Sequence, residues 1–208
     1  ISATAGAVTY TTANVNWTPV SNVTSYTIQR DTANTFNTGN LTAVTTASNI
    51  SSYQFTNTAP GTTYYYRIKA TTGAGADTLW SNIASRATTA LPTPTIANAQ
   101  VNPRTVTESW GATSGITTYT IQRASGASFS GATSETITGT SKTYSDTPIG
   151  TAQYYRVRAT ILRGTTTYTG AWSNVINYTS FVPQPNSVPT IASSISGSTA
   201  TGTSGAVS

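Results

Sequence analysis

The sequence contains no cysteine, histidine or methionine among its 208 residues. Without imidazole or thiolate groups, the chain has no histidine base, cysteine nucleophile, disulfide or zinc site of the usual ligand types. Acids are scarce as well, because only Asp31, Asp77, Glu108, Glu135 and Asp146 are present, scattered singly. We interpret Glu108 and Asp31 as ordinary surface charges, since neither has a second carboxylate at a catalytic spacing. The sequence therefore predicts no enzyme activity, no cofactor and no metal site.

Charge is sparse, with 7% charged residues and a formal net charge of +5. This balance reflects missing acids more than a dense basic patch, so we do not expect a nucleic-acid partner. No apolar run approaches the roughly twenty residues needed to span a bilayer, and we expect no membrane insertion. The absence of thiol and thioether side chains and the Ser/Thr-rich, Lys-poor composition favour an extracellular location.

The chain repeats itself with a period of about ninety residues. Residues 26–30 recur unchanged as residues 119–123, and Trp17 recurs as Trp110, both 93 positions later. Residues 65–70 resemble residues 154–159 at an offset of 89, and residues 80–83 resemble residues 172–175 at an offset of 92. The drift in offset places length changes between the repeated motifs, where loops tolerate them. Two domains follow from this pattern.

Apolar and polar residues alternate within each repeat, as at Tyr64, Tyr66, Ile68 and Ala70. This period of two, with Gly- and Pro-containing turns at short intervals, predicts half-buried antiparallel strands and no helix. We therefore expect an all-β chain of two tandem β-sandwiches with about seven strands each.

Several motifs resemble those of fibronectin type III domains. Residues 16–19 followed by residues 26–28 are similar to that family's second and third strands, with Trp17 in the core. Residues 59–70 resemble its tyrosine corner and sixth strand, and the resemblance implies that Tyr64 is the corner residue. The second repeat departs from this pattern, since Gln153 stands at the Tyr64 position. The resemblance implies spacing, adhesion or receptor work rather than catalysis.

We predict domain 1 over residues 1–90, domain 2 over 91–182, and a linker with a possible first strand of a further repeat over 183–208. The last assignment rests on residues 189–193, which resemble residues 94–98 at the entry to the second repeat. It leads us to expect that the chain is a segment of a longer array. Two prolines in residues 91–94 favour a semi-rigid connector.

Outward-facing cations are the candidate site. If Tyr64 and its alternating partners face inward, their neighbours must line the outer face of the same strand. These positions form a similar row in each domain: Tyr65, Arg67 and Lys69, then Tyr154, Arg156 and Arg158. Such rows can bind an acidic polymer or a neighbouring subunit. The alternative is a solvated strand face whose charges prevent unwanted sheet pairing. Residues 163–165 resemble an integrin motif but lack its acid, so integrin binding is not predicted.

The sequence thus predicts a non-catalytic, extracellular structural or adhesive module of a surface, fibre or appendage protein. Its expected partners are neighbouring domains, identical subunits or acidic glycans, and assembly into a fibre or surface layer is part of this hypothesis. The alternative is a spacer in a secreted glycan-degrading enzyme. A stand-alone glycan-binding module would need an exposed aromatic platform, which Trp17 and Trp110 cannot provide from a core. Trp80 and Trp172, near strand entries, are assigned neither to the core nor to the surface.

Overall fold

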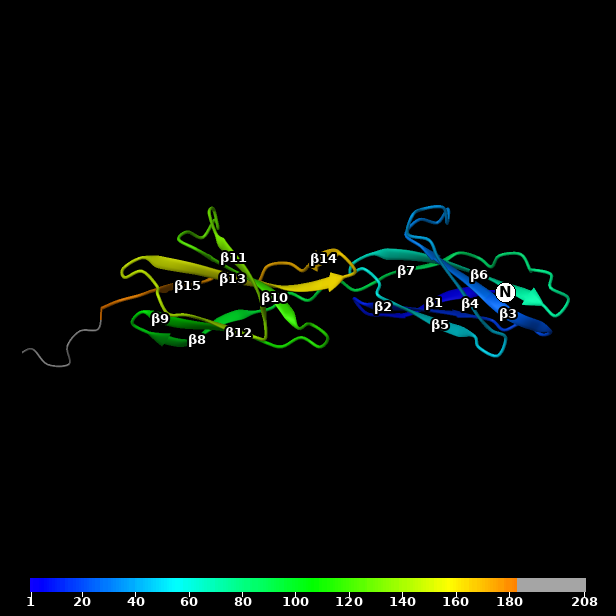
Figure 1. The fold of residues 1–208 in the computed structure, drawn as a ribbon, viewed down its shortest axis with the longest axis horizontal. Helices are drawn as coiled ribbons and strands as arrows, with labels where there is room; N and C mark the ends of the chain where they lie inside the picture. The colour runs from blue at the N-terminus through cyan, green and yellow to red at the C-terminus, as the bar shows by residue number, and fades with distance from the viewer. Residues whose placement is uncertain (183–208) are drawn as a thin grey trace, which may run out of the picture.

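Two β-sandwiches lie end to end along the long axis of the molecule (Figure 1). The computed structural model describes residues 1–182, and within this range the regular structure is entirely β. We call the unit formed by residues 3–87 sandwich 1 and the unit formed by residues 96–179 sandwich 2. The prediction of an all-β tandem of sandwiches is confirmed.

Sandwich 1 consists of a three-stranded and a four-stranded sheet, both antiparallel. The smaller sheet has the order β1-β2-β5, with β1 (Ala3–Val8), β2 (Thr12–Trp17) and β5 (Ser52–Thr56). The larger sheet has the order β4-β3-β6-β7, with β4 (Thr42–Ala47), β3 (Val23–Asp31), β6 (Thr63–Thr72) and β7 (Ala84–Ala87).

Sandwich 2 repeats this arrangement. Its smaller sheet has the order β12-β9-β8, with β12 (Ser141–Tyr144), β9 (Thr105–Trp110) and β8 (Ile96–Asn102). Its larger sheet has the path β11-β10-β13-β14, with β11 (Thr133–Thr138), β10 (Thr118–Ala124), β13 (Ala152–Arg163) and β14 (Thr166–Thr169). A last strand, β15 (Ile176–Thr179), pairs with the first half of β13.

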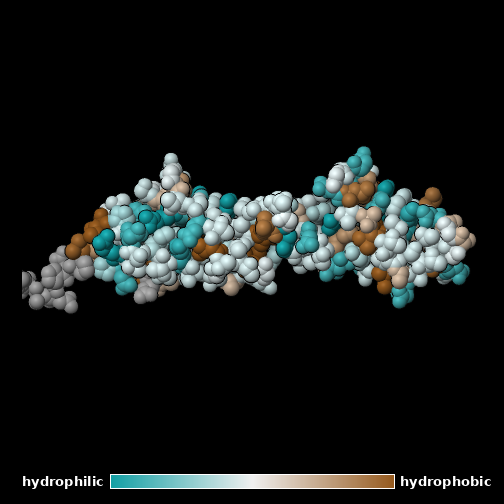
Figure 2. Space-filling view, in the orientation of Figure 1, coloured by the Kyte–Doolittle hydropathy of each residue, from teal (hydrophilic) through white to brown (hydrophobic). Residues whose placement is uncertain are grey.

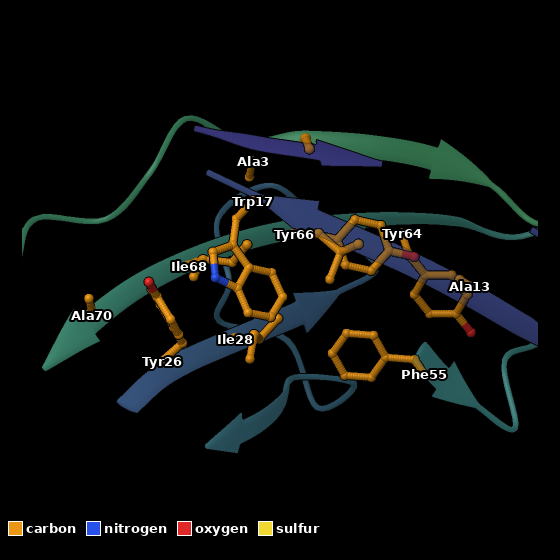
Figure 3. Packing of buried hydrophobic residues seen from close by; sticks show 12 residues of the cluster. Ala3, Ala13, Trp17, Tyr26, Ile28, Phe55, Tyr64, Tyr66, Ile68 and Ala70 are labelled. Carbon is orange, nitrogen blue, oxygen red and sulfur yellow. The ribbon is translucent and has the colours of Figure 1, made fainter. Parts of the chain in front are cut away.

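The core of each sandwich is built from the inward side chains of both sheets. In sandwich 1 the Trp17 ring lies 5.2 Å from the Tyr26 ring, between centroids, and Phe55 packs beside Tyr66 (Figure 3). Tyr66 is fully buried, as alternation along β6 predicts. Burying each large aromatic side chain contributes on the order of 2–3 kcal/mol, so these strands are stable only when the two sheets close on each other. Trp110 and Tyr119 form the same pair in sandwich 2, at 5.5 Å.

The two sandwiches touch at their junction. Leu91, from the connecting segment, is buried in the core cluster of sandwich 2, and Tyr10 from the β1–β2 turn packs against the same cluster. The Tyr10 hydroxyl donates a hydrogen bond to the carbonyl oxygen of Ser114. The neighbouring Gly115 has a φ of 75°, and a Cβ there would lie 2.6 Å from the Tyr10 hydroxyl. Glycine is therefore needed both for its backbone conformation and for the close approach of Tyr10.

Most of the surface in the view of Figure 2 is weakly polar, with hydrophobic residues in separate patches. This matches a chain in which about a third of the residues are Ser or Thr. The predicted linker and further strand in residues 183–208 lie outside the described residues, and the domain limits at residues 90 and 182 stay a prediction.

Candidate binding face

Strand β6 carries the first row of candidate residues. Its burial alternates regularly, with Tyr64, Tyr66, Ile68 and Ala70 buried in the core. Tyr65, Arg67 and Lys69 therefore lie on the outer face, as predicted, and each is half-buried rather than open to solvent. Aromatic rings cover Arg67 and Lys69.

The Arg67 guanidinium is held between two aromatic rings. Its central carbon lies 4.3 Å from the centroid of Phe36 and 4.4 Å from that of Trp80, and its Nε donates to Gln29 Oε1 at 2.8 Å. The Lys69 ammonium lies 5.3 Å from the same Trp80 ring. Cation–π contacts of this kind contribute about 0.5–1 kcal/mol each at exposed sites and about 2 kcal/mol when desolvated.

The row on β6 also has a carboxylate. Lys69 forms an ion pair with Asp77, and Thr71 donates a hydrogen bond to the other Asp77 oxygen at 2.8 Å. Hydrogen bonds from Lys69 and Thr71 hold the pKa of the Asp77 carboxyl below its ordinary value. One of the two cations in this row is therefore neutralised within the sandwich.

Strand β13 carries the second row, in the same geometry. Arg156 lies between Phe129 at 4.0 Å and Trp172 at 4.3 Å, and its Nε donates to Gln122 Oε1 at 2.8 Å. Arg158 lies 4.4 Å from the centroid of the same Trp172 ring. Tyr154 is half-buried on this face, two residues before Arg156.

The second row differs in having no acid beside it. In sandwich 1, Asp77 pairs with Thr71. At the equivalent position of sandwich 2, Thr169 pairs with Thr160. Desolvation, followed by the charge of Arg158, lowers the pKa of Arg156 from its ordinary value. Two arginines thus share one indole, and among the described residues neither forms an ion pair.

The residues after each tryptophan join the two sheets of a sandwich. The Ser81 backbone N–H donates to the Ile68 carbonyl at 2.8 Å, and the Ser81 hydroxyl accepts from the Ile68 N–H at 3.0 Å. The Asn82 side chain accepts from the Ala3 N–H at 2.9 Å and donates to the Ala3 carbonyl at 3.0 Å. Ser173 and Asn174 make the same contacts with Val157 and Ile96. The repeated Trp-Ser-Asn sequence therefore holds the stacked row and closes the sandwich edge.

Comparison with known proteins identifies the first unit. The family model described as "Fibronectin type III domain" matches residues 2–86. Residues 2–86 form a fibronectin type III domain. Sandwich 2 repeats its strand order and its Trp-Ser-Asn contacts, and it is a second domain of the same fold.

Among solved structures, a match is the chicken CNTN1 FN1-FN3 domains, with 17% identity and a TM-score of 0.37. The alignment covers 86% of this chain and 63% of that one, so the chain spans less than two thirds of its length. No curated protein matches the chain.

The family feature expected at Tyr64 is present in sandwich 1. The Ala59 backbone N–H donates to the Tyr64 hydroxyl at 2.9 Å, which ties the end of the β5–β6 connection to β6. In the second domain the Gln153 side chain bonds the adjacent Ala152 carbonyl instead. The hydrogen bond across this corner is therefore present in sandwich 1, and Gln153 does not form an equivalent one in sandwich 2.

Two acids are not the surface charges that the sequence analysis assigned. Glu108 and Asp31 are both fully buried. Glu108 alternates with Val106 and Trp110 on β9 and so points into the core, where neither carboxyl oxygen has a hydrogen-bond partner. Burial raises its pKa to about 8. The assignment failed because strand parity, which places position 108 inward, outweighs the preference of a carboxylate for water.

Asp31 is stabilised in its charged form despite its burial. Desolvation opposes ionisation, but hydrogen bonds from the Thr38 hydroxyl and from the Thr38 and Thr32 backbone N–H groups outweigh it, and the pKa of Asp31 lies below its ordinary value. Asp31 thus organises the loop between β3 and β4. This loop places Phe36 against Arg67.

Sequence reasoning missed four residues of the rows. Phe36 and Phe129 cover the arginines, and Gln29 and Gln122 fix their Nε groups. Both pairs recur at the offset of 93, which was a usable signal. The phenylalanines have positive φ values of 53° and 57°, a conformation that only the surrounding loop can impose and that sequence alone does not reveal.

Within residues 1–182 no group of three or more His, Cys, Asp or Glu side chains is placed to hold a metal ion. The same residues include no helix long and apolar enough to cross a membrane. The family match supports a non-catalytic module.

Proposed function

We propose that this chain is a structural and adhesive segment of an extracellular surface or fibre protein, and that its outer sheet faces contact identical subunits. The observation that carries the proposal is the row on β13, where Arg156 and Arg158 stack on Trp172 without a carboxylate. The rings fix the positions of two positive charges, so little side-chain entropy is lost when acceptor groups of a neighbouring subunit bind them.

The fold gives such a segment its mechanical role. Each sandwich closes its own core, and the Tyr10 and Leu91 contacts at the junction limit the angle between the sandwiches. A row of cations repeated at each sandwich offers regularly spaced contacts along the axis, which suits an array better than a single soluble partner. The family is typical of extracellular proteins, which supports this location.

Sedimentation of the purified chain over a range of concentration and salt tests the proposal. We expect self-association that weakens with salt, because exposed charge contacts are screened. The variant Arg156→Gln/Arg158→Gln removes both charges of the row on β13 and is expected to reduce association. Lys69→Gln is the matched control, since Asp77 already neutralises Lys69. A chain that stays monomeric at high concentration, or a double variant that associates like the wild type, contradicts the proposal.

A spacer role in a secreted glycan-degrading enzyme is the competing function. It uses the same non-catalytic fold but needs no adhesive face, so it predicts that the double variant and the wild type behave alike. The sequence that flanks this segment in the intact protein separates the two functions. Further sandwich repeats favour the array, and an adjoining catalytic domain favours the spacer.

A further inference from the structure

A polar cleft opens where the two sandwiches meet. Its volume is about 580 Å³. One wall comes from sandwich 1 and the other from the β13–β14 hairpin of sandwich 2, which Figure 1 shows extending toward sandwich 1. The lining residues that matter most are Arg30, Thr42, Asn57, Tyr64, Arg163 and Tyr168.

Arg30 brings a fixed positive charge to this cleft. Its guanidinium carbon lies 4.7 Å from the ring centroids of both Phe55 and Tyr64. Its Nη2 donates to Thr42 Oγ1 at 3.3 Å, whereas Nε and Nη1 are buried without a hydrogen-bond partner. All five acids of the chain lie in the described range, and none forms an ion pair with Arg30. The charge is therefore held in place without a counterion, which is costly for a half-buried cation.

Sandwich 2 shows a different partner for the corresponding arginine. Arg123 occupies the position of Arg30. Arg30 pairs with Tyr66, two residues after the corner residue on β6, and Arg123 pairs with Tyr155 at the same position on β13. Arg123 pairs with Asp146 at 3.4 Å.

The residue that corresponds to Asp146 in sandwich 1 is Asn57. Asp146 precedes the buried Thr147, and Asn57 precedes the buried Thr58. The backbone N–H groups of these two threonines donate to carbonyl oxygens in equivalent turns, at Arg104 and Thr11. Asn57 lines the cleft. The carboxylate that neutralises this arginine is thus replaced by an amide in the copy that faces the cleft.

A second arginine reaches the cleft from the other sandwich. Arg163 ends β13, and its Nε is buried without a hydrogen-bond partner. No acid lines the cleft. Two arginines from different domains therefore line one polar space. Guanidinium groups bind carboxylates with favourable geometry.

The other lining groups indicate which carboxylate fits. Amides and hydroxyls predominate, from Thr32, Asn40, Thr42 and Asn57, and these can bind sugar hydroxyls. Tyr64 and Tyr168 supply aromatic rings, while Leu41 and Leu162 are the two aliphatic side chains larger than alanine. The polar lining favours a sugar over the apolar side chains of a peptide. We propose that the cleft between the sandwiches binds a carboxylate-bearing saccharide, with a uronic acid unit held by Arg30 and Arg163.

The test is titration of the full chain with a uronic acid oligosaccharide, followed by calorimetry and by NMR shifts of the cleft residues. We expect wild-type binding that is lost with the neutral oligosaccharide of the same length. Asn57→Asp supplies the counterion that sandwich 2 uses, without removing any cleft side chain, and is expected to weaken binding by about tenfold or more. Asp tolerates the left-handed φ of 57° at this position about as well as Asn.

Further variants establish whether the saccharide binds at this cleft. Asp146→Asn makes the reciprocal change in sandwich 2 and should leave binding unchanged, while Arg163→Gln should weaken it. Arg156→Gln/Arg158→Gln should also leave saccharide binding unchanged. The proposal for the cleft and the proposal for the assembly face can therefore be tested independently. No binding by the wild type, unchanged binding by Asn57→Asp and Arg163→Gln, or equal affinity for an acidic peptide of matched charge would each overturn the proposal.

Discussion

The two sandwiches share one scaffold but distribute their few charges differently. The Trp-Ser-Asn contacts, the stacked arginine and the Trp–Tyr core pair are the same in both. The cores differ at one charged position, where sandwich 2 has Glu108 and sandwich 1 has Val15. The two residues are equivalent, because Glu108 pairs with β12 in the same way that Val15 pairs with β5. The scaffold depends on buried apolar contacts and backbone bonding, and charge is the variable that specialises each copy.

Outside the core the differences are reciprocal. Sandwich 1 neutralises a row cation with Asp77, and sandwich 2 has Thr169 there. Sandwich 2 neutralises Arg123 with Asp146, and sandwich 1 has Asn57 there. Lys69 is therefore compensated where its counterpart Arg158 is not, and Arg123 is compensated where its counterpart Arg30 is not. The first difference lies on the outer sheet face and the second at the junction. The predictions below alter these differences one at a time, beginning with the largest effect.

The largest expected effect comes from Glu108. Its folded pKa of about 8 lies above its ordinary value of 4.5, so its contribution to stability is greatest below the ordinary value and is lost as the pH rises through the folded value. We expect sandwich 2 to lose on the order of 3 kcal/mol of unfolding free energy between about pH 5 and about pH 9. Glu108→Val, which copies sandwich 1, should remove most of this pH dependence and stabilise sandwich 2 at high pH.

Differential scanning calorimetry across this pH range measures the effect. Sandwich 1 is the internal control, because Val15 does not titrate. The prediction is contradicted if the unfolding temperature of sandwich 2 stays the same across the pH range, or if the Glu108→Val variant retains the wild-type pH dependence.

The next effect concerns the indoles that hold the cations. Trp172→Ala is expected to destabilise sandwich 2 by about 2–3 kcal/mol, because both Arg156 and Arg158 lose their ring contact and are left close together. Trp80→Ala should cost sandwich 1 less, since Lys69 keeps Asp77 as a partner. Denaturant unfolding of the two variants provides the comparison, and a larger loss for Trp80→Ala would reverse the argument.

A smaller effect is expected at the tyrosine corner. Tyr64→Phe leaves the Ala59 N–H without its acceptor and should destabilise sandwich 1 by about 1 kcal/mol. Tyr65→Phe, on the outer face of the same strand, is the matched control and should change stability by less than about 0.5 kcal/mol. Equal effects of the two substitutions in urea unfolding would show that the corner hydroxyl has no special role.

The smallest effect concerns the exchanged surface charges. Asp77→Thr gives sandwich 1 the residue of sandwich 2, and Thr169→Asp makes the reverse change. Because surface ion pairs contribute little, we expect a small loss and a small gain of stability, each below the effect of Tyr64→Phe and each reduced by salt. Thermal unfolding at low and high salt measures both. Effects larger than that of Tyr64→Phe, or effects independent of salt, would mean that Asp77 does more than neutralise Lys69.

Much of this organisation could be predicted from the sequence. Period-two alternation gave the inward set on β6, and the repeated motifs gave two sandwiches. The resemblance to fibronectin type III domains gave the Tyr64 corner. The outward position of Arg67 and Arg156 followed from strand parity alone. These inferences succeed because a strand has only two faces, and one of them must be buried.

Other features depended on three-dimensional neighbours. The rings over Arg67 and Arg156 come from loops with positive φ at Phe36 and Phe129, and nothing local in the sequence predicts where such loops fold. Glu108 was assigned to the surface because no second carboxylate stands at a catalytic spacing from it, although Val106 and Trp110 on either side gave the correct parity. The junction cleft requires the relative placement of both sandwiches, which no single repeat encodes.

The most direct test of the claim that charge specialises each copy is a carbon-detected NMR titration of the five carboxyl groups in the intact chain. The account predicts that Glu108 titrates near pH 8, while Asp31 and Asp77 titrate below the ordinary aspartate value. A Glu108 carboxyl that titrates near its ordinary value of 4.5 would mean that it is solvated, and would contradict the account of how sandwich 2 differs from sandwich 1.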